Sequence, residues 1–532
     1  MNCKDGSWMK SRCQDTLQGR GSSMKIDALT RRQFVQQCAA AAGSFLLPSG
    51  LPALGAARRR PNIIYINADD LGWADPSCQG STFYRTPNLD RLAAEGVVLT
   101  NAYAPAANCA PSRACCMTGQ YTPRHGIYTV AGSERGKSKD RKLIPTPNTT
   151  VLAESHLTIA EVLKRHGYVT CHIGKWHLGD DPRTQGFDVN IAGCHWGSPS
   201  GGGYCSPYNY PNCEQEEEGE YLTDRLGLEA TRFIEGNRDR PFFLHFATHS
   251  VHAPFEGKPN LVAEYEKRAS SEAHNHPVYA AMVHSLDENV GRIMKKLDEL
   301  NLAGNTFVLF TSDNGGIWKI SKQWPLRSGK GSYYEGGIRE PMFVRWPGRI
   351  APGSRCDVPV IGIDFLPTFL DVAGLEKPEG HTLDGVSILP ILTQSGSIEE
   401  RPIYWHFPIY LQDGGPESRD PLFRTRPGSV IRYGDWKLHE YFEDGGVELY
   451  NLKEDISEKN DLAGKEPEKV KELHAMLKAW REEIGAPVPS ELNPDYKPSA
   501  SSSSETFPTD SQPQPSEADP FPDPNEENES PP

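Results

Sequence analysis

The chain has 532 residues, enough for a large enzyme domain with smaller additions, and its composition is that of a folded globular protein. It carries 70 Asp and Glu against 56 Lys and Arg, for a formal net charge of −14. This acidity argues against a nucleic-acid partner, because proteins that bind nucleic acids present basic surfaces to the phosphates.

Residues 1–57 are predicted to be an export leader. Arg31 and Arg32 precede a weakly hydrophobic, Ala-rich stretch at residues 38–57, and this order resembles a bacterial signal for the twin-arginine translocation machinery. Ser and Pro interrupt the stretch, so we predict no stable membrane insertion and a periplasmic or secreted protein. The alternative is a basic N-terminal helix that stays in the cytoplasm. Met1 and Met24 are both possible starts, and the cleavage site is left open.

Residues 58–395 are predicted to form an α/β catalytic domain, because strand and helix patterns alternate along them. Continuous apolar runs indicate strands covered on both faces, at residues 63–66, 168–173, 242–247 and 307–311. Helices are predicted between them, at about residues 86–96, 158–166 and 279–297. The expected fold is a mixed, largely parallel sheet between helices.

The C-terminal part is predicted to have a different arrangement of secondary structure. Residues 396–487 are expected to form a smaller α+β subdomain, with short antiparallel strands and an amphipathic helix at residues 467–484. Residues 488–532 are expected to be a disordered tail, since acidic residues, Ser and Pro dominate them and no Lys or Arg follows Lys497. The simplest interpretation gives this tail no role of its own.

Polar residues follow each of the four apolar runs. The first run leads to Asp69 and Asp70, the second to Lys175 and His177, the third to His249 and His252, and the last to Asp313 and Asn314. A single Asp after a strand is usually a turn or capping residue. Because the carboxyl ends of strands meet at one edge of an open α/β sheet, we expect these groups to converge on a site.

The chemistry of that site can be predicted from the residue types. Asp69, Asp70, Asp313 and Asn314 offer hard oxygen ligands, which favour calcium or magnesium over zinc. The cationic candidates form a second group: Arg113, Lys175, His177, His252 and Lys330. A divalent metal beside several fixed cations suits the binding of an oxyanion and the charge that grows during its transfer.

Cys109 begins a segment whose Pro111 suits the first turn of a helix, with Arg113 on the same helical face. A helix N-terminus attracts anions, so Cys109 is placed where an oxyanion would bind. Such a cysteine is ordinarily a buried small hydrophobe, or else a thiolate nucleophile. Neither explains an oxygen-rich metal site alongside, because a hard cation pairs poorly with sulfur.

The segment Cys109-Ala110-Pro111-Ser112-Arg113 resembles the Cys-X-Pro-X-Arg signature of the type I, formylglycine-dependent sulfatases of the alkaline phosphatase superfamily. Gly167-Tyr168-Val169-Thr170, followed by Gly174-Lys175-Trp176-His177, is similar to their second signature, and the resemblance runs from about residue 61 to residue 462. It implies an alkaline-phosphatase-like fold. The sequence also resembles bacterial glycan sulfatases described as arylsulfatases or N-acetylgalactosamine sulfatases.

The resemblance implies that a formylglycine-generating enzyme converts Cys109 to an aldehyde whose hydrate attacks the sulfur atom. One Ca²⁺ would be held by Asp69, Asp70, Asp313, Asn314 and an oxygen of modified Cys109. Arg113, Lys175 and Lys330 would hold the sulfate. His252, chosen over His249 because it stands just before Ala253-Pro254, would protonate the leaving oxygen. His177 would take a proton from the second hydroxyl of the hydrate and so release sulfate.

The expected substrate is a sulfated carbohydrate of galactose or N-acetylgalactosamine type, cut from a chain end. Tyr204, Tyr208 and Tyr210 offer rings for stacking on sugars, and four further residues are candidates to line the mouth: Trp196, Trp318, Arg327 and His406. Packing is the alternative role for all of these. Cys194, Cys205 and Cys213 lie close enough in sequence for a disulfide.

Two rival functions remain open at this point. One is a phosphate or phosphonate ester hydrolase of the same superfamily. The phosphatases of that superfamily typically bind two zinc ions through His and Asp, whereas this sequence supplies one oxygen-rich set of ligands. The other is a non-catalytic protein that binds sulfated glycans. The exact substrate, the oligomeric state and the disulfide connectivity are left open.

Overall fold

The computed structural model describes residues 59–415 and 417–498. The predicted leader and the last part of the predicted tail therefore lie outside the described residues. Within the described residues, no helix is both long and apolar enough to cross a membrane.

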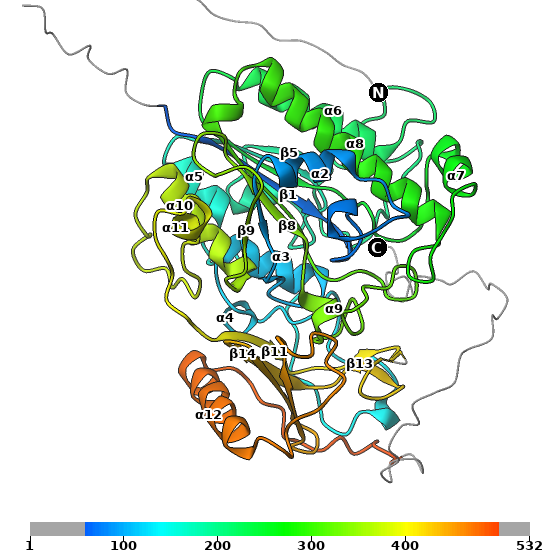
Figure 1. Cartoon of the computed structure of the whole chain (residues 1–532), viewed down its shortest axis with the longest axis vertical. Coiled ribbons are helices and arrows are strands. Elements are labelled where there is room, and N and C mark those ends of the chain that lie inside the picture. Colours follow the sequence, from blue (N-terminus) through cyan, green and yellow to red (C-terminus); the bar gives the residue numbers. More distant parts are fainter. Residues whose placement is uncertain (1–58, 416, 499–532) are drawn as a thin grey trace, which may run out of the picture. The chain divides into compact units, whose positions relative to one another are not determined.

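The core of the fold is an eight-stranded mixed sheet (Figure 1). Its strands, in spatial order, are β5 (Val189–Ile191), β4 (Val169–Gly174), β6 (Phe242–Ala247), β1 (Asn62–Ala68), β7 (Thr306–Ser312), β8 (Met342–Arg345), β2 (Val97–Leu99) and β9 (Ser354–Cys356). The first five strands in this order, from β5 through β4, β6 and β1 to β7, run parallel to one another. Strand β8 is antiparallel to both of its neighbours. The predicted mixed, largely parallel sheet is confirmed.

Helices cover both faces of this sheet. Side chains of β1 alternate between two apolar clusters, with Ile64 and Ile66 in one and Ile63 and Tyr65 in the other, as the two-residue repeat of a strand requires. The first cluster includes residues of α2 (Pro87–Ala94), α6 (Leu222–Gly236), α7 (Pro259–Tyr265) and α8 (Pro277–Glu299). The second includes residues of α3 (Cys109–Thr118), α5 (Ile159–Arg165), α10 (Phe365–Ala373) and α11 (Leu389–Leu392).

Smaller elements complete this part of the chain. They are the strand pair β3 (Ala102–Tyr103) and β10 (Val360–Ile361), the one-turn helices α4 (Thr122–His125) and α9 (Glu335–Ile338), and the 3-10 turns η1 (Ser77–Gln79), η2 (Ser138–Asp140), η3 (Pro182–Gln185), η4 (Ala303–Asn305) and η5 (Gly362–Asp364).

The C-terminal subdomain contains a second, antiparallel sheet, in agreement with the prediction. Its strands, in spatial order, are β11 (Ile403–Phe407), β14 (Gly428–Tyr433), β15 (Trp436–Tyr441) and β16 (Val447–Asn451). The amphipathic helix α12 (Pro467–Ile484) packs on this sheet through Leu473, Leu477 and Trp480. A two-stranded hairpin, β12 (Leu411–Gln412) and β13 (Phe423–Thr425), extends from the subdomain (Figure 1).

The chain stays paired beyond α12, so the predicted disordered tail begins too early. The backbone N–H of Ile144 donates to Glu491 at 2.9 Å, and that of Asn493 donates to Lys142 at 2.9 Å. Farther along, Lys497 donates to Lys139 at 2.8 Å. These contacts are made by backbone atoms, which is why composition did not reveal them.

Candidate active site

The carboxyl ends of β1, β4, β6 and β7 bring polar side chains together. Asp69 and Asp70 follow β1 directly, and Asp313 follows β7. The backbone N–H of Asp70 donates to Asp313 Oδ1 at 3.2 Å, and Lys175, directly after β4, donates from Nζ to Asp69 Oδ2 at 2.8 Å. Residues from separate parts of the sequence therefore form one buried cluster at this edge of the sheet.

The turn after Asp70 is held by Asp75, a residue that no motif in the sequence indicates. Asp75 Oδ2 accepts hydrogen bonds from the backbone N–H of Gly72 at 2.8 Å and from the Tyr279 hydroxyl at 2.5 Å. Asp75 Oδ1 accepts one from Ser321 Oγ at 2.6 Å. Asp70 itself has φ 62°, a left-handed conformation that Asp tolerates better than most residues. Asp75 thus fixes the backbone that presents Asp70.

Three carboxylates crowd the centre of the cluster. Asp69, Asp70 and Asp313 are fully buried, and with Cys109 they offer ligand atoms that all lie within 4.8 Å of one another. Burial raises the pKa of Asp313 to about 6, with Arg113 opposing that rise and Asp69 adding to it. The Oδ1 atom of Asn314 is buried without a hydrogen-bond partner among the described residues. Such a set of hard oxygen donors fits a divalent cation such as Ca²⁺ or Mg²⁺.

Three cationic side chains contact these acids. Arg113 binds Asp313 Oδ2 through Nε at 2.8 Å and through a terminal nitrogen at 2.7 Å, and its other terminal nitrogen donates to the Lys175 carbonyl at 2.8 Å. Lys330 Nζ donates to Asp70 Oδ2 at 2.8 Å. Burial would raise the pKa of Asp70, but Lys330 and other nearby cations hold it well below its usual range.

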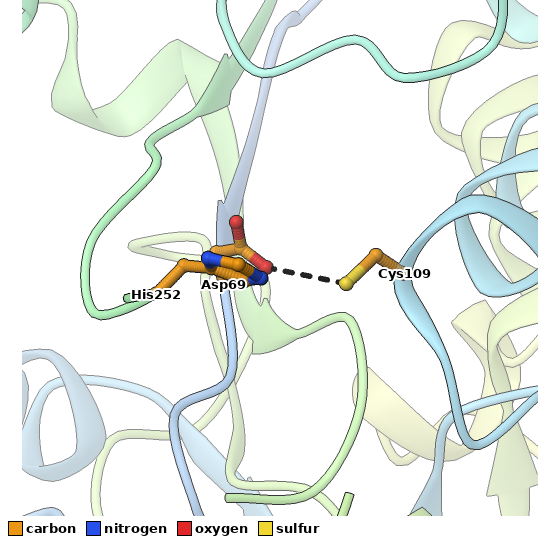
Figure 2. A group of neighbouring side chains, drawn as sticks. All are labelled: Asp69, Cys109 and His252. Atoms are coloured by element: carbon orange, nitrogen blue, oxygen red, sulfur yellow. Dashed lines mark hydrogen bonds between the residues drawn. The ribbon is translucent and has the colours of Figure 1, made fainter. Parts of the chain in front are cut away.

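Cys109 is the first residue of α3 and is 1% exposed. Its Sγ lies 3.6 Å from Asp69 Oδ1 and 3.9 Å from Asp70 Oδ1. Figure 2 shows this sulfur pointing from the helix end toward Asp69. Burial raises the pKa of the thiol far above that of a free cysteine, although Lys175 and Lys330 oppose the rise. The unmodified side chain is therefore held as a neutral thiol, which is a weak nucleophile.

His252 lies at the same centre, with its ring beside Asp69 in Figure 2. Its Nδ1 is 2.6 Å from the carbonyl oxygen of Ala253, which can only accept, so Nδ1 carries the proton of that bond. Nε2 lies 3.7 Å from Asp70 Oδ2. The Tyr204 hydroxyl lies within donating distance of two carbonyls of this turn, those of His249 at 2.6 Å and His252 at 2.8 Å. The turn is thus fixed with Nε2 on the side of the carboxylates.

His177 lies under the loop that follows β5. Its backbone N–H donates to the Cys194 carbonyl at 2.9 Å, and a Cβ added at Gly197 would lie 2.5 Å from its ring carbon Cε1. Only glycine at position 197 lets this loop cover the ring. Burial, with Lys175 and Arg113 nearby, lowers the pKa of His177 well below its ordinary value. His177 is therefore neutral over the physiological range, and its Nδ1 has no hydrogen-bond partner among the described residues.

The tyrosines predicted to stack on sugars are buried instead. Tyr204, Tyr208 and Tyr210 belong to the apolar cluster on one face of the main sheet. The Tyr208 hydroxyl donates to Glu220 Oε2 at 2.7 Å, and that of Tyr210 donates to the Gly203 carbonyl at 3.1 Å. The prediction is wrong for these residues, because their rings and hydroxyls already have partners within the protein. Among the described residues, no disulfide is formed by the three cysteines of this loop, at positions 194, 205 and 213.

The other predicted mouth residues divide into two kinds. Trp196 and Trp318 are partly exposed. Arg327, by contrast, donates from Nε to the Glu417 carbonyl at 2.9 Å and from a terminal nitrogen to the Glu458 carbonyl at 2.9 Å. His406 is 2% exposed and lies inside the C-terminal subdomain, between Ser429 Oγ at 2.8 Å and the Pro487 carbonyl at 2.9 Å. Arg327 and His406 are thus hydrogen-bonded to other residues of the protein, which fits the structural role that was the alternative to lining the mouth.

The burial of His406 predicts a pH-dependent stability. Burial lowers its pKa from 6.5 to about 3, against the opposing bond to Pro487. Between these pH values the unfolded chain binds one proton more at this residue than the folded chain does, so stability falls as the pH falls. We expect His406→Gln to make the pH dependence shallower by about 1.4 kcal/mol per pH unit below pH ~6.

The measurement is urea unfolding at pH values from 7 down to 4.5. Ser429→Ala is the matched control, because it removes a bond to His406 but leaves the ring buried. It should lower stability by a similar amount at every pH and keep the wild-type slope. An unchanged slope in His406→Gln would contradict the assignment of proton uptake to this residue.

Nine of the predicted site residues are thus brought together by direct contacts or shared proximity: Asp69, Asp70, Cys109, Arg113, Lys175, His252, Asp313, Asn314 and Lys330. His177 faces the same cations.

Comparison with known proteins gives a consistent result. A family model described as sulfatase matches residues 61–375, and one described as N-sulphoglucosamine sulphohydrolase, C-terminal, matches residues 329–484. A sulfatase of Formosa agariphila is 32% identical over 511 residues, covering 81% of this chain and 90% of that protein. Human N-acetylgalactosamine-6-sulfatase is 34% identical over 391 residues, covering 67% and 70%. The solved structure of Ps i-CgsB in complex with k-i-k-neocarrahexaose has a TM-score of 0.66 at 30% identity, covering 79% of this chain and 93% of that one.

Proposed function

We propose that this chain, which belongs to the sulfatase family and is a sulfuric ester hydrolase, uses one Ca²⁺ ion and a formylglycine that is made from Cys109. The formylglycine-generating enzyme would act on Cys109 before export. Export of the folded protein by the twin-arginine machinery would then place it in the periplasm or outside the cell.

The position of Cys109 carries the proposal. Its sulfur lies among buried carboxylates that suit a hard cation, and burial keeps the thiol neutral. An unmodified thiol is therefore a poor nucleophile and a poor metal ligand at this place. A hydrated aldehyde at the same position supplies oxygen for both purposes, and a bound Ca²⁺ lowers the pKa of an oxygen that it contacts.

The charge balance of the cluster also supports a metal. Asp69, Asp70 and Asp313 are matched by Arg113, Lys175 and Lys330, so the six groups together carry little net charge when all are ionised. A divalent cation held by the carboxylates and by Asn314 would leave an excess of positive charge. That excess attracts a sulfate ester, and the three basic side chains are placed to hold its oxygens.

The two histidines suit complementary proton transfers. The Nδ1–H of His252 is engaged by the Ala253 carbonyl, so the doubly protonated ring would give its Nε2 proton to the departing sugar oxygen and remain neutral. His177 is held neutral by burial and by neighbouring cations, so it can take up a proton when sulfate is released. The His249 ring packs against Tyr210, with ring centroids 5.4 Å apart, whereas it is His252 that groups with Asp69 and Cys109, so we assign His249 no proton transfer.

We infer that the substrate is a sulfated carbohydrate of galactose or N-acetylgalactosamine type, cut at a chain end. Two similar proteins support this class: human N-acetylgalactosamine-6-sulfatase by its name, and Ps i-CgsB by its complex with an oligosaccharide. Trp196 and Trp318, both partly exposed, are the aromatic residues that we assign to contact with the sugar.

The test measures sulfate release from a sulfated galactose, a sulfated N-acetylgalactosamine, their oligosaccharides and an aryl sulfate. We expect kcat/KM on at least one sugar to exceed that on the aryl ester by about tenfold or more, because sugar contacts add binding energy that a flat ring lacks. A higher kcat/KM on the aryl ester than on every sugar would refute the carbohydrate class. Cleavage only at internal units would refute the end-on mode.

A matched phosphate ester completes the panel. A higher kcat/KM on the phosphate ester than on its sulfate counterpart would favour a phosphohydrolase. Binding of the sulfated sugar without any release of sulfate would favour a non-catalytic glycan-binding protein.

A further inference from the structure

Lys330 lies in residues 327–335, an irregular segment after β7 that ends at Glu335, the first residue of α9. The middle of the segment is fixed to the catalytic domain, since the backbone N–H of Lys330 donates to the Gly316 carbonyl at 2.9 Å. The next residue, Gly331, donates to the Ala107 carbonyl at 2.9 Å. The two ends of the segment also contact the C-terminal subdomain.

Glu458, in the loop after β16, contacts both ends. Its carbonyl oxygen accepts a hydrogen bond from a terminal nitrogen of Arg327 at 2.9 Å. Its side-chain Oε2 accepts one from the backbone N–H of Glu335 at 2.5 Å. Glu458 is fully buried, so neither contact competes with water. One residue of the subdomain therefore spans the segment that carries Lys330.

A buried charge cluster holds the Glu458 side chain in place. Lys437 Nζ lies 3.0 Å from Glu458 Oε1 and 2.9 Å from Glu335 Oε1, and all three side chains are fully buried. His439 Nε2 lies 3.3 Å from the same Glu458 oxygen. Burial alone would raise the pKa of Glu335, but Lys437 and Arg339 hold it well below its usual range. Breaking such a pair leaves an uncompensated buried charge, so the cluster resists rearrangement.

We propose that Glu458 is a positioning residue for Lys330, which lets the C-terminal subdomain set where the Lys330 ammonium group meets the substrate sulfate. The inference rests on the proposed role of Lys330 as a sulfate ligand. It assigns Arg327, a predicted mouth residue, to the same task, because Arg327 is the link between Glu458 and the start of the segment.

The consequence is a loss of sulfate binding without loss of the catalytic groups. In Glu458→Gln the side chain keeps its size but loses its charge. Lys437 then loses one of the two carboxylates with which it pairs, and its position relative to Glu335 can change. We expect kcat/KM to fall about tenfold or more, since a misplacement of roughly 1 Å in an active site can cost about a hundredfold. The affinity for inorganic sulfate should fall as well.

Glu440→Gln is the matched control. Glu440 lies on β15 in the same subdomain and is paired with Arg481 at 2.6 Å and His474 at 2.9 Å, on the side of α12. Its side chain makes no hydrogen bond to residues 327–335. This variant should lose stability but keep kcat/KM and sulfate affinity within about twofold, as expected for a polar change away from the site.

The decisive experiment is a double-mutant cycle with Lys330→Met, read out by kcat/KM and by calorimetric binding of inorganic sulfate. If Glu458 acts through Lys330, Glu458→Gln should cause less than about a twofold further loss in the Lys330→Met background, because the two changes remove one interaction. Additive losses would overturn the proposal and leave Glu458 a general stability role.

Two provisions keep the test decisive. If Glu458→Gln does not fold, Arg327→Met replaces it in the same cycle, because it cuts the link to Glu458 without removing a buried acid. If the wild-type enzyme binds inorganic sulfate but releases none from any ester, the proposed function fails, while the sulfate-binding cycle still decides the role of Glu458.

Discussion

Replacing Cys109 with alanine is expected to lower kcat by at least about 10³-fold while leaving the fold intact, since loss of a nucleophile leaves only the contribution of binding and charge. The substitution removes the thiol at the start of the helix, whose sulfur lies 3.6 Å from Asp69 Oδ1 and 3.9 Å from Asp70 Oδ1. Sulfate release at saturating substrate and the thermal midpoint are the two measurements.

Cys116→Ala is the matched control for that substitution. Cys116 lies on the same helix, is buried, and belongs to the apolar cluster on one face of the main sheet. Its loss should reduce stability through the small cavity it leaves, without a comparable effect on kcat. A Cys109→Ala enzyme that retains wild-type kcat would remove Cys109 from the reaction.

The second large effect is expected from Asp313→Asn, which should lower kcat by about 100-fold or more at micromolar calcium, as loss of a charged metal ligand weakens binding of a hard cation. Chelation of the wild-type enzyme should have the same effect. A readout besides activity is the thermal midpoint, which calcium should raise in the wild-type protein because a ligand of the folded state stabilises it. Calcium should raise it much less in the variant.

Asp287→Asn controls for the loss of a buried carboxylate. Asp287 lies on α8 and accepts hydrogen bonds from the backbone N–H groups of Asn88 and Leu89. Its substitution should destabilise the start of α2 yet leave both kcat and the calcium-induced stabilisation unchanged. If Asp313→Asn instead retains full kcat in the presence of chelator, the metal assignment is wrong.

The main sheet and the centre of the site were predictable from sequence for one physical reason. A continuous apolar run in the sequence indicates a buried parallel strand, and a sudden change to polar residues indicates its carboxyl end. Asp69 and Asp70 after β1, and Asp313 and Asn314 after β7, follow this pattern, so their convergence could be inferred from the order of residues alone. Pro111 and Arg113 placed Cys109 at a helix start in the same way.

The partners of long or amphipathic side chains were not predictable. From the sequence, Tyr208 and Tyr210 could face either a sugar or the core. In the structure their hydroxyls bond to Glu220 and Gly203, and the irregular backbone that brings these groups together leaves no sequence pattern. Arg327 could bind a sulfate or a carbonyl, and only the packing of the subdomain brings it to Glu458. The role of Asp75 likewise depends on Tyr279 and Ser321, which lie far away in the sequence.

The central claim is that an aldehyde derived from Cys109 is the nucleophile that splits the sulfate ester. Mass spectrometry of the tryptic peptide containing Cys109, measured on preparations with different degrees of modification, tests it most directly. The proposed mechanism predicts that active preparations contain formylglycine at this position and that sulfate release rises in proportion to its fraction. Full activity in a preparation whose Cys109 is entirely an intact thiol would contradict it.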